Sequence, residues 1–447
     1  MTIALDRPSI GTARSATLAF IAFAILVTGA LAIVVYVVPL NANDMLKHLL
    51  RFEDRGFWGV LSKYLKYHPT SPDWRFLQLP FGYVLYRLAN GHEHLMFKGL
   101  LIVSLIGTTW MFIRQMPVRS WIDAAAASIA LLILFGHHSF AGAVEGVYPW
   151  GVEIVLVACQ IAVVGILLRE RTFASEMAAF LISVFALVLN EKGAAVGSTY
   201  IVGAILRMPG GSIRAAACTF VAYLGFLWLR FYVFRSLFGV SGKREDETPY
   251  LFDAVAPVLN VLISDPQFGQ FVVFANTFAG KPGAIIVLVS SLATTALIVV
   301  WAIVQRKRPE AGLFALLIVT LMTTMIFGPY SKKNYIPILA LPIYALAAYY
   351  ALRWLFDAYR GIAIGLACVL FVAWTIRFGG LGYHMAIYAH VYQEEWRQAE
   401  VWGAADEHDP RMTAPIIDRL RREALSRTFP DPEKTLPSFW RNLLQAR

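Results

Sequence analysis

Long apolar runs recur along the chain, and they restrict its fold more than any other feature. The first run covers residues 15–40, which is more than the roughly 20 residues that a helix needs to cross a bilayer. Only 15% of the 447 residues are charged, compared with about 25% in ordinary soluble domains. The first run is too long for a signal-peptide core and has no clear cleavage site, so we expect a retained span. The sequence predicts an all-α polytopic membrane protein.

Basic residues mark one side of this predicted bundle. Many of the 39 Lys and Arg residues lie in short connections between apolar runs, as they do in cytoplasmic connections of membrane proteins. The clusters are Arg7/Arg14, Arg114/Arg119, Arg169/Arg171, Arg207/Arg214, Arg306-Lys307-Arg308 and Arg353/Arg360. This distribution accounts for the net charge of +10 without invoking nucleic acid. Cys159, Cys218 and Cys368 all fall inside apolar runs, which indicates neither a disulfide framework nor a metal site.

The basic clusters define about eleven transmembrane helices, with the N-terminus inside and the C-terminus outside. The predicted spans are 15–40, 95–113, 120–137, 150–168, 175–190, 193–206, 215–239, 283–304, 311–328, 335–352 and 361–377. The region 175–206 is alternatively one long broken segment. The outer connections are then 41–94, 137–149, 190–193, 240–282, 329–334 and 378–447. Three of these six are long and every inner connection is short, so we expect the chemistry on the outer face.

The chain divides into a transmembrane domain, residues 1–377, and a short outer segment, residues 378–447. The outer segment is too short and polar to build a core of its own, although residues 414–425 predict one amphipathic helix. The first outer loop, 41–94, belongs to the transmembrane domain. Its apolar residues over 45–67 recur mostly every three or four positions, which predicts an interfacial helix lying in the membrane plane.

Asp44 lies a few positions beyond the first apolar run and is the first candidate for chemistry. A carboxylate at the mouth of a membrane helix is costly against lipid and useful in a wet, enclosed site. As a general base, Asp44 would deprotonate an acceptor hydroxyl. As a structural residue, it would cap the helix that follows, as Asp and Asn commonly do. Both interpretations stand on position alone.

Cationic residues on the predicted outer side are the second set of candidates. Lys332 and Lys333 depart from the positive-inside bias and suit a lipid phosphate, with non-specific headgroup contact as the alternative. Arg230 either snorkels to the headgroups or clamps a phosphate with its planar fork. Glu191 and Lys192 interrupt two apolar runs at a tight turn. There they are either solvated or line a cavity, with Lys192 meeting an anionic group.

The second outer turn offers a third set. His137, His138 and Glu145 suggest a metal at first sight, but adjacent histidines rarely point the same way and no third ligand has convincing spacing. We therefore expect no metal there. Glu145, close to Trp150, is a better candidate for binding a sugar hydroxyl over an aromatic face. Glu153 falls one turn into the next helix and is interpreted as structural.

Seven ionisable candidates from five separate segments fall on the same predicted face. They are Asp44, Glu145, Glu191, Lys192, Arg230, Lys332 and Lys333. Other residues define the topology, and a random scatter of polar residues would rarely give this result. Acids and cations on one membrane face suit a reaction between a phosphate-linked lipid and a hydroxyl acceptor.

The order of the polar motifs along the chain resembles that of a known group. After the acid that follows the first span come Trp74-Arg75-Phe76-Leu77, Gly91-His92-Glu93-His94, His138 with Glu145, Asn190-Glu191-Lys192-Gly193 and Lys332-Lys333-Asn334-Tyr335-Ile336-Pro337. This order is similar to that of the GT-C glycosyltransferase superfamily, especially protein O-mannosyltransferases and bacterial lipid-A sugar transferases. The resemblance covers roughly residues 15–377.

The resemblance implies a polyprenyl-phosphate sugar donor, a lipid, glycan or protein acceptor, and transfer on the periplasmic or lumenal side. For this chain we expect the periplasmic side of a bacterial inner membrane. It implies that Asp44 is the base. It also implies donor-phosphate contacts, with Lys333 nearest to the family's basic residue before Tyr-x-x-Pro. The expected phosphate-binding residues are Lys333, Lys332, Arg230 and Lys192, and the expected substrate-binding residues are Glu145, Glu191, His138, Trp150 and Arg75.

The chain departs from the family pattern in four places. Tyr335-Ile336-Pro337 is one residue shorter than the family motif, and the charges of Glu191 and Lys192 stand in reversed order. No proline follows His138. Asn43 stands where a second acid is often found, which weakens the case for a divalent metal. No other cofactor is expected.

Two other classes of protein fit a bundle of this kind. A lipid-linked glycan polymerase or ligase is also a many-span enzyme, and it depends on outer-loop arginines rather than on a base after the first span. A transporter or flippase usually has internal repeats and polar sites near the membrane midplane, whereas the charges here gather on one face. The sequence favours an inverting glycosyltransferase over both.

Overall fold

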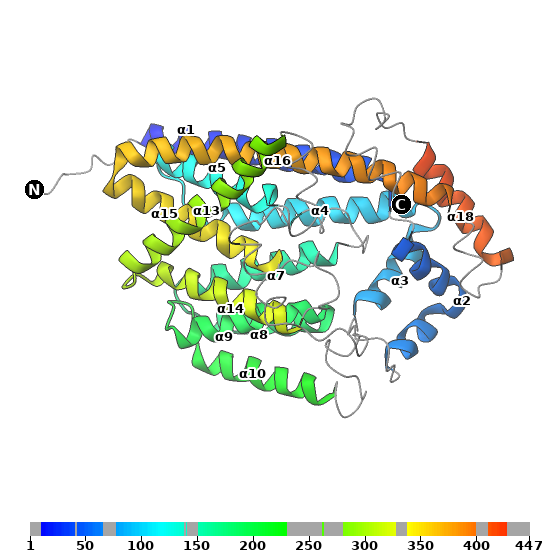
Figure 1. The fold of residues 1–447 in the computed structure, drawn as a ribbon. Helices are drawn as coiled ribbons and strands as arrows, with labels where there is room; N and C mark the ends of the chain where they lie inside the picture. The colour runs from blue at the N-terminus through cyan, green and yellow to red at the C-terminus, as the bar shows by residue number, and fades with distance from the viewer. Residues whose placement is uncertain are drawn as a thin grey trace, which may run out of the picture.

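The structure is a computed structural model that describes residues 10–40, 43–65, 77–137, 140, 151–229, 262, 280–327, 338–398 and 410–426. Within these ranges every regular element is a helix. Long helices lie side by side in one bundle, and three further helices, α2, α3 and α18, gather beyond one of its ends (Figure 1).

Among the described residues, eleven apolar helices form the bundle, and each overlaps one predicted span. They are α1 (Ile10–Val37), α4 (Glu93–Ile113), α5 (Trp121–Gly136), α7 (Val152–Leu167), α8 (Phe173–Leu189), α9 (Ala194–Ile205), α10 (Ile213–Trp228), α13 (Gly280–Val304), α14 (Gly312–Phe327), α15 (Leu341–Ala358) and α16 (Arg360–Arg397). Among the described residues, five stretches are long and apolar enough to cross a membrane: Gly11–Val37, Glu93–Ile113, Ile285–Val304, Ile338–Ala358 and Arg360–Gly382. The other six are shorter apolar helices. The protein is thus an α-helical membrane protein.

α1 is apolar on both its buried and its exposed side. α1 buries Phe20 and Leu31 against its neighbours while it exposes Ile25, Leu26 and Ile33. A helix that is hydrophobic all round lies in a protein core or in a membrane, and these exposed side chains indicate the membrane. In contrast, α15 is enclosed by α5, α13, α14 and α16, and the core of the bundle lies around it.

One end of the bundle, named here the basic end, contains the turns 114–120, 168–172, 206–212 and 305–311. The hydroxyl of Thr17 donates to the carbonyl of Val118 at 3.1 Å, and the hydroxyl of Tyr349 donates to Pro117 O at 2.7 Å. Asp123 forms an ion pair with Arg353 at 2.6 Å, from Oδ1 to Nε. The described basic residues at this end are Arg14, Arg114, Arg119, Arg169, Arg171, Arg207, Arg214, Arg306, Lys307, Arg308, Arg353 and Arg360.

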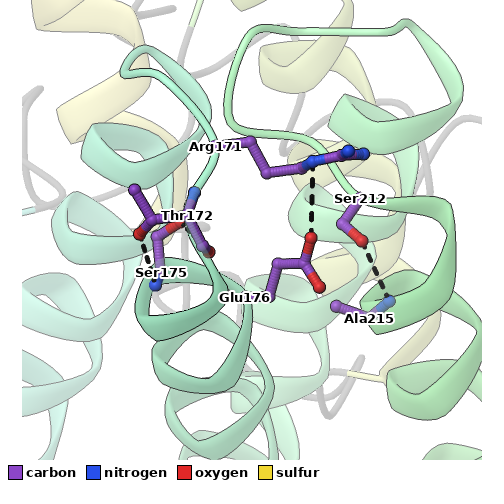
Figure 2. A network of polar contacts seen from close by, with 6 residues as sticks. All are labelled: Arg171, Thr172, Ser175, Glu176, Ser212 and Ala215. Carbon is purple, nitrogen blue, oxygen red and sulfur yellow. Dashed lines mark hydrogen bonds and ion pairs between the residues drawn. The ribbon is translucent and has the colours of Figure 1, made fainter.

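Helix starts at the basic end are capped by nearby side chains. Figure 2 shows Thr172 and Ser175 at the start of α8, where the Ser175 N–H donates to Thr172 Oγ1 at 3.1 Å and the Thr172 N–H donates to Ser175 Oγ at 2.9 Å. In the same view Arg171 pairs with Glu176 at 3.4 Å, and the Ala215 N–H donates to the Ser212 hydroxyl at 3.4 Å. Such caps satisfy backbone groups that a helix end leaves without partners.

The opposite end, named here the capped end, is covered by α2 (Asn43–Leu65), α3 (Gln78–Ala89) and α18 (Pro410–Leu425). α2 bends at Gly56, whose φ of 62° favours glycine. The helix predicted over 45–67 is therefore present. However, its Leu46, Leu49 and Leu50 are buried against protein, so these three side chains do not face the membrane interface.

One further boundary differs from the expected one, whereas the segments predicted at 175–190 and 193–206 are present as two separate helices. α16 continues as one helix through residue 377 to Arg397, so the expected start of the outer segment lies inside a helix. The region 175–206 forms two helices, α8 and α9, which pack together and are joined by a short 3₁₀ helix, η2 (Glu191–Gly193).

Candidate functional site

Buried ionisable side chains are concentrated in the half of the bundle at the capped end. Charged residues are almost never fully buried in proteins unless they are paired. Among the described residues nine Asp, Glu, Lys, Arg or His side chains are buried, and eight of them lie in this half. The eight are His48, Glu93, His94, Lys98, His137, Glu153, Lys192 and Arg377, and Asp123 is the ninth, at the basic end. The capped end is therefore the place to look for chemistry.

The α8–α9 turn has a defined structure. The side-chain oxygen of Asn190 accepts the Lys192 N–H at 3.0 Å, and the Gly193 N–H donates to Asn190 O at 2.8 Å. A Cβ at Gly193 would lie 1.9 Å from the carbonyl oxygen of Ala186, so no larger residue fits without a shift of backbone. This turn holds Lys192 in one place.

Lys192 is half of a buried ion pair. Its Nζ lies 3.6 Å from Oε1 of Glu153, and the two side chains are 11% and 10% exposed. From the sequence, Glu153 is interpreted as structural, and no local pattern joins it to Lys192, because the two lie on different helical segments. A charge removed from water is stabilised only if its partner and its hydrogen bonds are retained. Glu153 therefore fixes the position of the Lys192 ammonium inside the bundle.

The first loop contacts the α8–α9 turn. The Asn190 side-chain N–H donates to Gln78 Oε1 at 2.9 Å, and the Leu77 N–H donates to Val188 O at 3.4 Å. Gln78 is fully buried, and its Nε2 has no hydrogen-bond partner among the described residues. The start of α3, the start of α7 and the α8–α9 turn thus meet around one cluster of polar groups.

Asp44 lies in the first turn of α2, and its side chain is outside the described residues. An acid in the first turn is favoured by the positive end of the helix dipole, so the capping interpretation remains open beside the catalytic one. The backbone just before it is well held. Trp396 Nε1 donates to Leu40 O at 2.7 Å, and His94 Nε2 lies 3.1 Å from Tyr36 O.

A second polar network joins the helices of the capped end. Arg419 of α18 pairs with the fully buried Glu93 at 2.5 Å. The hydroxyl of Tyr86 donates to Glu53 Oε1 at 2.6 Å. Burial, together with the Glu53 carboxylate, raises the pKa of Tyr86 above its ordinary value, so its hydroxyl keeps its proton and remains a donor. The network ties α2, α3, α4 and α18 together.

Arg377 is buried between α16 and α13. Its Nη1 donates to Ser291 Oγ at 2.6 Å and to Ser290 Oγ at 3.2 Å, and its guanidinium carbon lies 3.9 Å from the centre of the Trp374 ring. Neither Arg377 nor Lys98 is among the residues predicted for the site. Both are charged residues close to the ends of predicted spans. The sequence does not show that their side chains are buried inside the bundle.

Most of the residues predicted for the site lie outside the described residues. These are Arg75, His138, Glu145, Trp150, Arg230, Lys332 and Lys333. The backbone of Asp44 and of Glu191 is described at the capped end, while their side chains are not. Lys192 is the predicted site residue whose side chain is described, and it lies in the buried cluster.

The described residues contain no group of three or more His, Cys, Asp or Glu side chains that could hold a metal ion. In comparisons with known proteins, the chain matches no family model, no curated protein and no solved structure. The resemblance to GT-C enzymes therefore rests on the sequence motifs.

Proposed function

We propose that the protein is an inverting membrane glycosyltransferase similar to the GT-C superfamily, with about eleven spans and its active site at the capped end. The donor is a polyprenyl-phosphate sugar, and the acceptor is a hydroxyl of a lipid, glycan or protein. In this proposal the basic end faces the cytoplasm, as the positive-inside rule requires, and the capped end faces the periplasm of a bacterial inner membrane.

The observation that carries the proposal is the asymmetry of buried charge between the two ends. Ionisable groups inside a membrane bundle are costly to bury and mark functional sites by default. Eight of the nine buried ones in the described part lie in the half at the capped end. A phosphate-linked lipid and a hydroxyl acceptor need cations and an acid in one sheltered place, and this end supplies both.

The reaction is a displacement at the anomeric carbon. Asp44 takes the proton of the acceptor hydroxyl, and the acceptor oxygen forms the new bond to the anomeric carbon. The bond from that carbon to the phosphate oxygen breaks, and its electron pair stays on the phosphate. Lys333, Lys332 and Arg230, together with Lys192, stabilise the charge that grows on the phosphate.

Glu153 and Gln78 fit this scheme as supporting groups. Glu153 keeps the Lys192 ammonium in place before the donor arrives, which avoids reorganisation during the reaction. The Nε2 of Gln78 is a buried donor without a partner among the described residues, and an oxygen of the substrate would satisfy it. Glu145, Glu191, His138, Trp150 and Arg75 would bind the sugar and the acceptor.

The test begins with the product. Surface glycolipids of cells with and without the gene are compared by mass spectrometry, and cells that lack the gene then receive Asp44→Asn. We expect Asp44→Asn to insert at wild-type levels and to lose transfer, because an amide cannot take the proton. Asp357→Asn, the same change at an exposed position of the basic end, should restore the product.

Near-wild-type product from Asp44→Asn would show that Asp44 is not the base. The donor class is tested separately in isolated membranes with synthetic lipids. Transfer from a monosaccharide polyprenyl phosphate supports the proposal, whereas transfer only from a glycan lipid diphosphate would indicate a polymerase or ligase. Solute uptake that depends on the protein, without any new glycolipid, would indicate a transporter.

A further inference from the structure

We infer that the last described helices, the end of α16 and α18, position the α1–α2 corner that holds Asp44, and that Trp396 is the positioning residue. This inference rests on the proposed function in one respect, the role of Asp44 as a base. The positioning itself is a statement about the fold and has a readout of its own.

The corner begins at the C-terminal end of α1, where helix carbonyls lose their intrahelical partners. A side chain from another helix meets one of these carbonyls, and a second side chain binds the backbone just beyond the end of α1. His94 of α4 meets Tyr36 O at 3.1 Å, and Trp396 of α16 donates to Leu40 O at 2.7 Å. The Trp396 ring is fully buried, so water does not compete for its hydrogen bond. The next helix, α2, carries Asp44 in its first turn.

Trp396 is held in turn by α18. Arg421 Nε donates to Trp396 O at 3.0 Å, and Gln393 Nε2 donates to Ala424 O at 2.9 Å. The apolar side of α18, with Ile416 and Leu420, is buried against the protein. A continuous series of hydrogen bonds therefore runs from α18 through the end of α16 to the corner before Asp44.

A second contact of α18 supports the other end of the same region. Arg419 pairs with Glu93 at the α3–α4 turn. Gly91 in that turn has a φ of 93°, and a Cβ there would lie 3.8 Å from Arg419 Cδ. The turn thus takes a shape that favours glycine and passes close beside the arginine. α3 then holds α2 through the hydrogen bond from Tyr86 to Glu53.

The expected consequence of losing this support is specific. A catalytic group displaced by about 1 Å can cost up to roughly a hundredfold in rate. Binding of the donor phosphate uses other residues, so KM for the donor should not change. A general loss of folding would instead lower the amount of active enzyme and its stability.

The experiment compares Trp396→Phe with Trp301→Phe. Trp301 is also buried, at the basic end, where it stacks on Tyr350. For Trp396→Phe we expect faster amide hydrogen exchange over residues 43–50 than in the wild type. We also expect kcat to fall by roughly tenfold to a hundredfold with an unchanged KM for the polyprenyl-phosphate sugar. Trp301→Phe should show neither effect.

A second pair of variants covers the case in which Trp396→Phe does not fold. Arg421→Gln removes the contact to Trp396 O, whereas Arg422→Gln changes an exposed residue of the same helix whose Nε bonds within α18. Unchanged exchange over 43–50 in the folded test variant would overturn the inference, as would faster exchange with unchanged kcat in an enzyme that loses transfer with Asp44→Asn. If Asp44→Asn keeps its activity, the proposed function fails, while the exchange result still decides whether α18 positions the corner.

Discussion

The two ends of the bundle differ in how their polar groups find partners. At the basic end, short turns and local caps satisfy the backbone, as Ser120 does for the Asp123 N–H at 3.1 Å and Thr172 for Ser175. At the capped end, side chains from distant helices are buried together with their charges, as in the pair of Lys192 and Glu153. Local caps are sufficient to end a helix. The cost of burying charge therefore indicates that the capped end has a task besides closing the bundle.

The largest expected effect comes from breaking the ion pair of Lys192 and Glu153 at the capped end. Lys192→Met leaves the Glu153 carboxylate buried without its partner, which should lower the free energy of unfolding by about 3–5 kcal/mol. The double variant Lys192→Met/Glu153→Leu should recover most of that stability and still lack transfer, since it restores packing without the cation. Unfolding in detergent and the glycolipid product are measured for both.

The matching change at the basic end is Arg353→Met. Its side chain is 33% exposed, and the buried Asp123 carboxylate keeps the hydrogen bond from the Arg119 N–H at 2.8 Å. We therefore expect a smaller loss of about 1–2 kcal/mol and unchanged transfer at low temperature. A double variant of Lys192 and Glu153 with full activity would contradict the difference between the two ends.

Adding one methyl group to a glycine at each end allows their effects on stability to be compared. Gly193→Ala would bring a Cβ to 1.9 Å from Ala186 O and force the α8–α9 turn to move, for which we expect a loss of about 2–3 kcal/mol. Gly312→Ala at the basic end meets Met208 Sδ at 3.4 Å, so its effect should stay within about 0.5 kcal/mol. Thermal unfolding of the two purified variants gives the answer, and equal melting temperatures would count against the rigid turn.

The smallest expected effect is a change in stability at alkaline pH. The pKa of Tyr86 is raised by burial and by Glu53, so the folded protein keeps a proton that the unfolded chain releases near pH 10. The associated stability is complete below pH 10 and declines as the pH rises further. Tyr86→Phe should cost about 1 kcal/mol at neutral pH and show a weaker decline above pH 10. Melting temperatures at pH 7–11.5 test this, and parallel curves for both proteins would refute it.

Local patterns predicted the helices well but not the contacts between them, for a physical reason. The apolar runs, the helix over 45–67 and the helix over 414–425 depend on periodicity within one segment, and the structure has helices at all of them. The contacts of the capped end join residues far apart in the chain, such as Trp396 and Leu40 at a separation of 356 positions. No local sequence pattern predicts such a contact. Asp44 as the base and Lys332 and Lys333 as phosphate contacts stay predictions.

The enclosed position of α15 has a consequence for biosynthesis. α15 packs against α5, which the ribosome makes early, and against α16, which it makes after α15. Until α15 arrives, α5 lacks one of the helices that cover its buried surface. The helices made before α15 must therefore stay in the bilayer without the helix against which they pack in the finished bundle. Shortened chains that stop before residue 338 should consequently be recognised by membrane proteases instead of accumulating.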